Sequence, residues 1–170
     1  MIPAALTFIF ATMIGRSRTK FFVPPEEKTH VMPDELVQPD ARTVLILEDD
    51  PVMANLLKDY LQPRKFLVTH VTGGAEGVQK ILAADFDVIL CDMVMPGFPG
   101  DMFYRAVERA RPHLCKRFIF MTGHTGDTRI DEFIRGIRGL MLWKPFQIHE
   151  VLDAIKIVLR KTSSGKQASQ

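Results

Sequence analysis

The chain of 170 residues is 46% hydrophobic and 25% charged, which fits one globular domain with some additional sequence. Its 22 basic and 20 acidic residues leave a net charge of only +2, and no segment combines basic with interleaved aromatic residues as nucleic-acid-binding surfaces do. We therefore expect no nucleic acid among its partners.

The two cysteines bear on the compartment in which the chain works. Cys91 lies inside an apolar run and Cys115 follows a helical pattern, and neither belongs to a group of several Cys and His residues such as a zinc site requires. We interpret both as reduced thiols and expect a cytoplasmic protein.

Residues 1–15 contain no charged side chain, whereas residues 16–20 are abruptly basic. The apolar run is shorter than the roughly 20 residues of a membrane-spanning helix, and it lacks the basic start and the cleavage site of a secretory signal. Three interpretations stay open. In the first, the segment packs on the domain or on a partner, or it arises from the choice of start site. In the second, residues 1–15 contact a membrane, and in the third they form a signal peptide. We favour the first, and the basic residues favour a cytoplasmic location for the rest of the chain.

Residues 19–41 lose all periodicity and gather prolines among charges, so we expect an apolar segment and a Pro-rich linker over residues 1–41. One folded domain is expected over residues 42–161. The polar, aperiodic residues 162–170 predict a disordered tail. Because the chain ends soon after the last predicted helix, we expect a stand-alone domain without a second output domain.

Within residues 42–161, short β-rich apolar runs alternate with helical periods, which predicts a parallel sheet with helices on both faces. Three runs are almost wholly apolar, as is typical of strands covered on both sides. Pro51 fits the first position of the first helix. The predicted fold class is therefore α/β, a doubly wound five-stranded parallel sheet. The predicted strands are Val44–Leu47, Phe66–Val71, Asp87–Cys91, Phe118–Met121 and Leu140–Trp143.

Two of the predicted helices show a clear apolar stripe on one face. In the first helix it consists of Met53, Leu56, Leu57, Tyr60 and Leu61, and in the last helix of Ile148, Val151, Leu152, Ile155 and Leu159.

Chemically active side chains follow four of these strands, at the edge of the sheet where α/β proteins bind ligands. The first strand is followed by three acidic residues, 48–50, and the third by Asp92. Thr122 follows the fourth strand and Lys144 the fifth. The topology therefore predicts that carboxylates, a hydroxyl and an ammonium group meet at one edge.

Each of these residues alone has an ordinary structural explanation. Asp50 precedes Pro51 and is expected to cap the first helix rather than bind a ligand. A turn would explain Asp92, a helix cap Thr122 and a solvated charge Lys144. Together they indicate a site, because clustered carboxylates raise one another's pKa unless a cation or a lysine offsets them. A hard cation such as Mg²⁺, bound together with a phosphoryl group, suits these oxygen ligands.

The runs VLILEDDP, DVILCDMVMPGFPG, FIFMTGH and LWKPF resemble, in order and spacing, the four motif blocks of response-regulator receiver domains. The resemblance is to chemotaxis-type single-domain response regulators, covers about residues 42–161, and implies the flavodoxin-like receiver fold. The segment DEFIRGIRG followed by LMLWKPF is also similar to receivers attached to hybrid histidine kinases.

This resemblance implies that Asp92 accepts a phosphoryl group. It implies that Glu48 and Asp49 hold Mg²⁺ together with Asp92 and the main-chain carbonyl of Val94. The implied donor is a histidine kinase or a histidine phosphotransfer protein. Because phosphohistidine is already a reactive donor, positioning and charge neutralisation suffice for transfer to a weak carboxylate nucleophile.

The resemblance further implies that Thr122 bonds a phosphoryl oxygen, that Lys144 pairs with the phosphoryl group, and that the peptide bond to Pro145 is cis. We therefore expect a phosphoacceptor of a two-component phosphorelay that signals through contacts with a downstream protein partner. We do not expect an enzyme, since such a chain catalyses only its own phosphorylation and dephosphorylation.

The chain departs from the family pattern at Met141 and in the segment from Arg129 to Gly139, which lacks the small-acidic loop common before the fifth strand. Most receivers carry an aromatic residue three positions before the lysine, where this chain has Met141. A flexible thioether occupies either of two arrangements with little energetic contrast, so we expect phosphorylation to change partner affinity only modestly. Val94 and His124 stand where family members flank the hydrolytic water. Because Val94 cannot hydrogen-bond a water, we expect slow self-dephosphorylation unless His124 compensates.

Two rival interpretations are disfavoured. Aspartyl phosphatases of the haloacid-dehalogenase type place a second Asp two residues after the nucleophile, where this chain has Val94. A degenerate receiver that only binds partners is disfavoured by the complete set of acidic, hydroxyl and ammonium residues at the strand ends.

Overall fold

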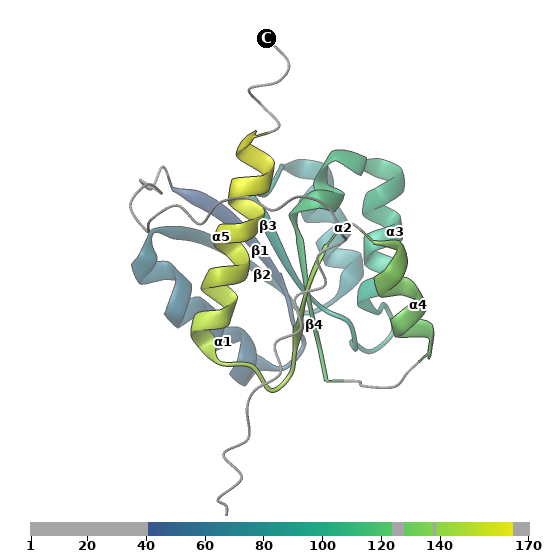
Figure 1. Cartoon of the computed structure of the whole chain (residues 1–170), viewed down its shortest axis with the longest axis horizontal. Coiled ribbons are helices and arrows are strands. Elements are labelled where there is room, and N and C mark those ends of the chain that lie inside the picture. The colour runs from purple at the N-terminus through teal and green to yellow at the C-terminus, as the bar shows by residue number, and fades with distance from the viewer. Residues whose placement is uncertain (1–40, 124–127, 138, 165–170) are drawn as a thin grey trace, which may run out of the picture.

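The computed structural model describes residues 41–123, 128–137 and 139–164. Five parallel strands form one sheet in the order β2-β1-β3-β4-β5, which confirms the predicted α/β fold (Figure 1). The order changes direction at β1, so the crossovers on its two sides place helices on opposite faces of the sheet. The strands are β1 (Arg42–Leu47), β2 (Phe66–Val71), β3 (Val88–Asp92), β4 (Phe118–Thr122) and β5 (Leu140–Trp143).

Helices cover both faces of the sheet (Figure 1). One face packs against α1 and α5, and its core gathers aliphatic side chains from these helices and from β1, β3, β4 and β5. The other face packs against α2, α3 and α4 and contains most of the buried aromatic rings. The helices are α1 (Pro51–Leu61), α2 (Gly74–Ala83), α3 (Gly100–Ala110), α4 (Thr128–Gly136) and α5 (Ile148–Ser164), with short 3-10 turns η1 (Gln62–Arg64) and η2 (Pro112–Arg117).

The start of α1 forms as its sequence predicts. Pro51 occupies the first turn, and the Asp50 side chain accepts a hydrogen bond of 2.8 Å from the Val52 main-chain N–H. This bond satisfies one of the N–H groups that a helix start leaves without an intrahelical partner. The assignment of Asp50 to capping is thereby confirmed.

Several details of the predicted elements are wrong. β1 begins at Arg42 and not at Val44, and β3 and β4 each extend one residue further, to Asp92 and Thr122. Leu56 is 49% exposed, because α1 buries Ala54, Leu57 and Leu61 instead and turns Leu56 away from the sheet. Asp87 does not belong to β3. Its carboxylate accepts hydrogen bonds from the main-chain N–H and the hydroxyl of Thr43, which ties the start of β1 to the segment before β3.

The last helix extends further than the sequence predicts. α5 runs to Ser164, past the expected domain end at position 161. The Thr162 hydroxyl donates to the carbonyls of Val158 and Leu159, and the Ser163 hydroxyl donates to Leu159. These polar side chains therefore bond back onto the preceding helical turn.

The predictions for residues 1–40 and 165–170 lie outside the described residues. Among the helices of the described ranges, none is both long enough and apolar enough to cross a bilayer.

Candidate functional site

The side chains singled out at the strand ends meet at the carboxyl edge of the sheet. Asp92 is the last residue of β3 and Thr122 the last of β4, and both are buried. Glu48 directly follows β1 and is only 1% exposed, while Lys144 directly follows β5. Because β1, β3, β4 and β5 are consecutive neighbours in the sheet, these four positions lie side by side.

Three carboxylates converge at this edge. One oxygen each of Glu48, Asp49 and Asp92 lies within 4.8 Å of the other two. Glu48 and Asp92 are buried, whereas Asp49 is exposed, so the cluster opens to solvent on the Asp49 side. An all-oxygen donor set with one open side fits Mg²⁺, which binds few protein carboxylates and keeps several waters.

Lys144 joins two of the carboxylates. Its Nζ lies 2.7 Å from Asp92 Oδ2 and 2.9 Å from Glu48 Oε2. Burial alone would lower the pKa of Lys144, but the hydrogen bonds to Asp92 and Glu48 raise it above its ordinary value. The Lys144 main-chain N–H donates to the Thr122 carbonyl at 2.7 Å, and the peptide bond to Pro145 is cis.

Among the three carboxyl groups of the cluster, Glu48 has a raised pKa. Burial raises its pKa to about 7, and the negative charge of Asp92 adds to this effect while Lys144 opposes it. Lys144 alone therefore does not compensate the two buried carboxylates. A divalent cation at the converging oxygens would supply the missing positive charge, which is a second reason why this donor set fits Mg²⁺.

The loop after β3 is held close to Asp92. The Val94 main-chain N–H donates to Asp92 Oδ1 at 3.0 Å, and the Gly100 N–H donates to the Met93 carbonyl at 3.2 Å. The Val94 side chain is 46% exposed. Its main-chain carbonyl as a metal ligand stays a prediction, and His124 lies outside the described residues.

Sequence reasoning missed one residue at the site. His70, on β2, places its Nε2 2.9 Å from the Glu48 main-chain oxygen. No sequence motif predicts this contact, because a single histidine in a strand pattern does not indicate that its side chain bonds to the main chain of a distant residue.

Met141, the predicted departure from the aromatic pattern, is buried beside an aromatic ring. It pairs in register with Phe120 of β4, and Phe120 contacts the rings of Tyr104 on α3 and Phe133 on α4 at centroid distances of 5.6 Å and 5.4 Å. The ring contacts of Phe120 thus come from α3 and α4, while β5 contributes Trp143 at the margin of the same core.

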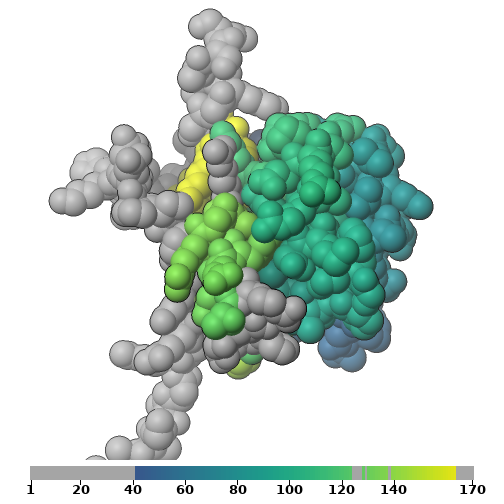
Figure 2. Space-filling model, turned by 90° about the vertical axis from the view of Figure 1, so that its right-hand side faces the viewer, coloured from purple at the N-terminus to yellow at the C-terminus, as the bar shows by residue number. Residues whose placement is uncertain are grey.

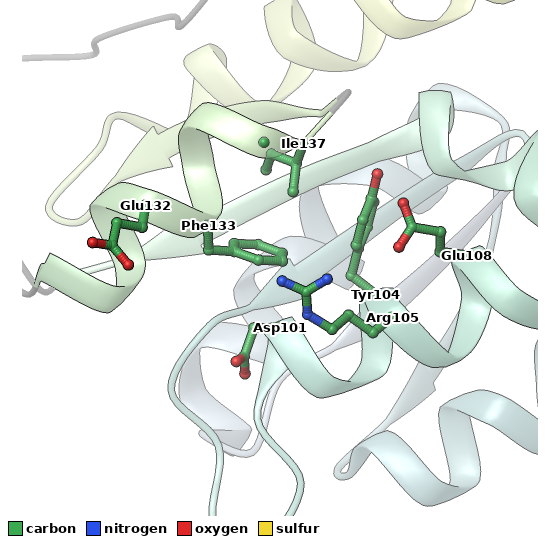
Figure 3. A pocket seen from close by; sticks show the side chains of 8 residues that line it. Asp101, Tyr104, Arg105, Glu108, Glu132, Phe133 and Ile137 are labelled. Atoms are coloured by element: carbon green, nitrogen blue, oxygen red, sulfur yellow. The ribbon is translucent and has the colours of Figure 1, made fainter.

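A separate hollow of about 350 Å³ lies between α3 and α4, which sit next to each other on the face shown in Figure 2. Figure 3 shows Tyr104 and Phe133 at this hollow and the Arg105 guanidinium group near Phe133, 5.9 Å from the ring centroid. Asp101, Glu108 and Glu132 add carboxylates to its lining. It belongs to different elements from the acidic cluster.

The fold and the site together define a class: a doubly wound α/β domain of the receiver type, with an acidic cluster and a lysine at the carboxyl edge of its sheet. The family model described as "Response regulator receiver domain" matches residues 44–156. The chain therefore belongs to the response regulator receiver domain family, whose members are the receiver domains of two-component systems.

Relatives and solved structures agree with this assignment. The transcriptional regulatory protein ResD of Bacillus subtilis is 29% identical over 127 residues, which cover 74% of this chain and 51% of ResD. The chain spans about half the length of the curated relatives it matches. The CheY-like receiver domain protein of Methanospirillum hungatei has the same fold, with a TM-score of 0.68 and 21% identity over 74% of this chain and 99% of that one. The receiver domain of a signal transduction histidine kinase from Syntrophus aciditrophicus is 27% identical, with a TM-score of 0.63 over 71% of this chain and 92% of that one.

The raised pKa of Glu48 predicts how metal affinity depends on pH. A carboxylate must lose its proton to bind a cation, so apparent Mg²⁺ affinity should increase about tenfold between pH 6 and pH 8 and level off above. Without metal, the free energy of unfolding depends on pH in the opposite direction. Because folding raises the pKa of Glu48, the contribution of this carboxyl group to stability is fully present below pH 4.5 and is lost as the pH rises through about 7. Mg²⁺ titrations followed by tryptophan fluorescence, and thermal unfolding in a chelator, measure the two effects.

Glu48→Gln is the matched variant for both measurements, because it keeps the shape of the side chain and removes its titration. Its metal-free stability should be higher than that of the native chain at pH 8, and its Mg²⁺ affinity should be weak and flat with pH. An unchanged pH profile in this variant would show that another group titrates.

Proposed function

We propose that this chain accepts a phosphoryl group on Asp92 from a histidine kinase or a histidine phosphotransfer protein, in a Mg²⁺-dependent reaction in the cytoplasm. In this proposal the phosphorylated domain signals through contacts with a downstream protein. The chain is not an enzyme toward other substrates, since it catalyses only its own phosphorylation and dephosphorylation. The observation that carries the proposal is the convergence of Asp92, two further carboxylates and the Lys144 ammonium at one edge of the sheet.

The chemistry asks little of the protein beyond placement. A carboxylate oxygen of Asp92 attacks the phosphorus in line with the departing imidazole nitrogen; the O–P bond forms, the N–P bond breaks, and the nitrogen keeps the electron pair. The Val94 N–H and the Lys144 Nζ each hold one oxygen of the Asp92 carboxylate, which fixes its plane. Mg²⁺, held by Glu48, Asp49, Asp92 and the Val94 carbonyl, supplies positive charge to the phosphoryl oxygens when it is bound.

In this proposal two further residues of the site bind the product. Once the phosphoryl group is on Asp92, the Lys144 ammonium is close enough to exchange its carboxylate partner for a phosphoryl oxygen. The Thr122 hydroxyl, at the end of the neighbouring strand, bonds another phosphoryl oxygen in this proposal.

Labelling with a small phosphoryl donor tests the proposal directly. With radiolabelled acetyl phosphate and Mg²⁺ the chain should acquire label that is labile in both acid and alkali, as an acyl phosphate is, and a chelator should prevent labelling. Transfer from the phosphorylated histidine kinases of the source organism then identifies the donor. Equal labelling with and without Mg²⁺ would contradict the metal-dependent mechanism.

The exposed Val94 side chain predicts a long-lived product. Val94 offers no hydrogen bond to a hydrolytic water, so Val94→Asn should accelerate dephosphorylation by about tenfold, which is less than the roughly 100-fold lower range of acid–base assistance because an amide only positions the water. The rate of label loss after removal of the donor measures this effect. Met102→Asn is the matched control, because Met102 is similarly exposed, at 48%, but lies in α3; equal acceleration in both variants would refute a local role of Val94.

A further inference from the structure

His70 is bonded to the main chain of the acidic cluster. Its Nε2 lies 2.9 Å from the Glu48 carbonyl oxygen, and both groups are at least partly buried. Because a carbonyl oxygen only accepts hydrogen bonds, Nε2 must carry the proton and donate it. The contact joins β2, the edge strand on this side of the sheet, to the first residue beyond β1.

The main-chain hydrogen bonds between β1 and β2 do not provide a donor for the Glu48 carbonyl. Main-chain pairing between β1 and β2 ends with Leu47 opposite Val71, and the Glu48 N–H still donates to the Val71 carbonyl at 3.2 Å. Beyond Val71 the chain leaves the sheet toward α2, which begins at Gly74. The His70 imidazole therefore takes the place of the next ladder donor and satisfies the Glu48 carbonyl.

This carbonyl belongs to the peptide group that joins Glu48 to Asp49. A peptide group is planar, so a bond that fixes the Glu48 C=O also fixes the direction in which Asp49 leaves it. Glu48 is buried and Asp49 is exposed, yet an oxygen of each lies within 4.8 Å of the other and of Asp92. Rotation of this peptide group would separate the two carboxylates.

We propose that His70 is a positioning residue of the acidic site, whose imidazole N–H holds the peptide group between Glu48 and Asp49 so that their carboxylates converge on one cation. This inference rests on the proposed function. His70 contacts neither the cation nor the phosphoryl group, and acts only through the main chain. The Glu48 carboxylate has its own partners, Lys144 and the Asp50 N–H, so His70 is needed for the direction of the pair and not for the burial of Glu48.

Mg²⁺ titrations of the full chain test this role, with the metal alone as the probe. The only tryptophan, Trp143, directly precedes Lys144 and reports binding by fluorescence, and the amide NMR signal of Asp49 reports it independently. His70→Ala should weaken Mg²⁺ binding by roughly tenfold, the lower range for loss of an outer partner of a metal ligand. His70→Gln should bind Mg²⁺ within about twofold of the native chain, because its amide N–H is placed where Nε2 lies.

Leu67→Ala is the control for β2 itself, since Leu67 is exposed on the same strand and should leave Mg²⁺ affinity unchanged. Equal Mg²⁺ affinity in native and His70→Ala chains would overturn the inference. So would a loss of affinity in His70→Gln as large as in His70→Ala, because it would show that the ring's volume matters and not its N–H group. If the native chain itself bound no Mg²⁺, the proposed function would fail instead, and thermal unfolding in a chelator confirms that each variant is folded.

Discussion

Asp92→Asn should reduce phosphoryl labelling to background while leaving the domain folded. The variant removes the nucleophilic oxygen but keeps the size and shape of a side chain that is only 6% exposed. It also removes one of two buried carboxylates that share Lys144. Burial, the main cause of the raised pKa of Glu48, remains, but the smaller contribution from the negative charge of Asp92 is lost. We therefore expect thermal stability without metal to be equal to or higher than that of the native chain.

The measurement is acid-labile label from acetyl phosphate in the presence of Mg²⁺, with thermal unfolding recorded on the same samples. Asp101→Asn is the matched control, because it makes the same chemical change at the start of α3, outside the acidic cluster, and should label at the native rate. Native-level label on Asp92→Asn would place the acceptor elsewhere. Loss of label in both variants would indicate damage to the loop and not to a nucleophile.

The fold and the position of the site were predictable because both depend on local sequence signals. Parallel strands covered on both faces appear as continuous apolar runs, and topology alone places the residues after them at one edge of the sheet. This is why Glu48, Asp92, Thr122 and Lys144 are recognisable before any contact is known.

Contacts between a side chain and a distant main chain left no such signal. The partner of His70 is the Glu48 carbonyl, and the partner of the Asp87 carboxylate is the main chain of Thr43. A carbonyl or an N–H group has no sequence identity, so no residue pattern marks it as a partner. The aromatic packing around Phe120 could not be predicted from Met141 for a different reason. It depends on how α3 and α4 lie on the sheet, which the sequence around Met141 does not determine.

Gly100 illustrates a constraint that only the packing reveals, and it carries the largest stability effect that we expect. A Cβ atom at this first residue of α3 would overlap the Asp92 main-chain oxygen and lie 3.0 Å from Cys91 Sγ. The nearest atom is backbone and cannot rotate away, so either α3 or the end of β3 must shift. Gly100→Ala should therefore destabilise the domain by about 2–4 kcal/mol, the range of severe packing changes, and lower its Tm by roughly 10 °C.

Because the displaced atom belongs to Asp92, the same substitution should slow phosphorylation even at temperatures where the variant is folded. Gly136→Ala is the matched control: a Cβ there would meet nothing within 4 Å, and alanine in a helix should change stability by less than about 1 kcal/mol. Thermal unfolding of both variants, followed by labelling rates well below each Tm, measures the two effects. Equal unfolding temperatures for the two variants would refute the close approach at Gly100, while a destabilised variant with native labelling rates would show that α3 moves and Asp92 does not.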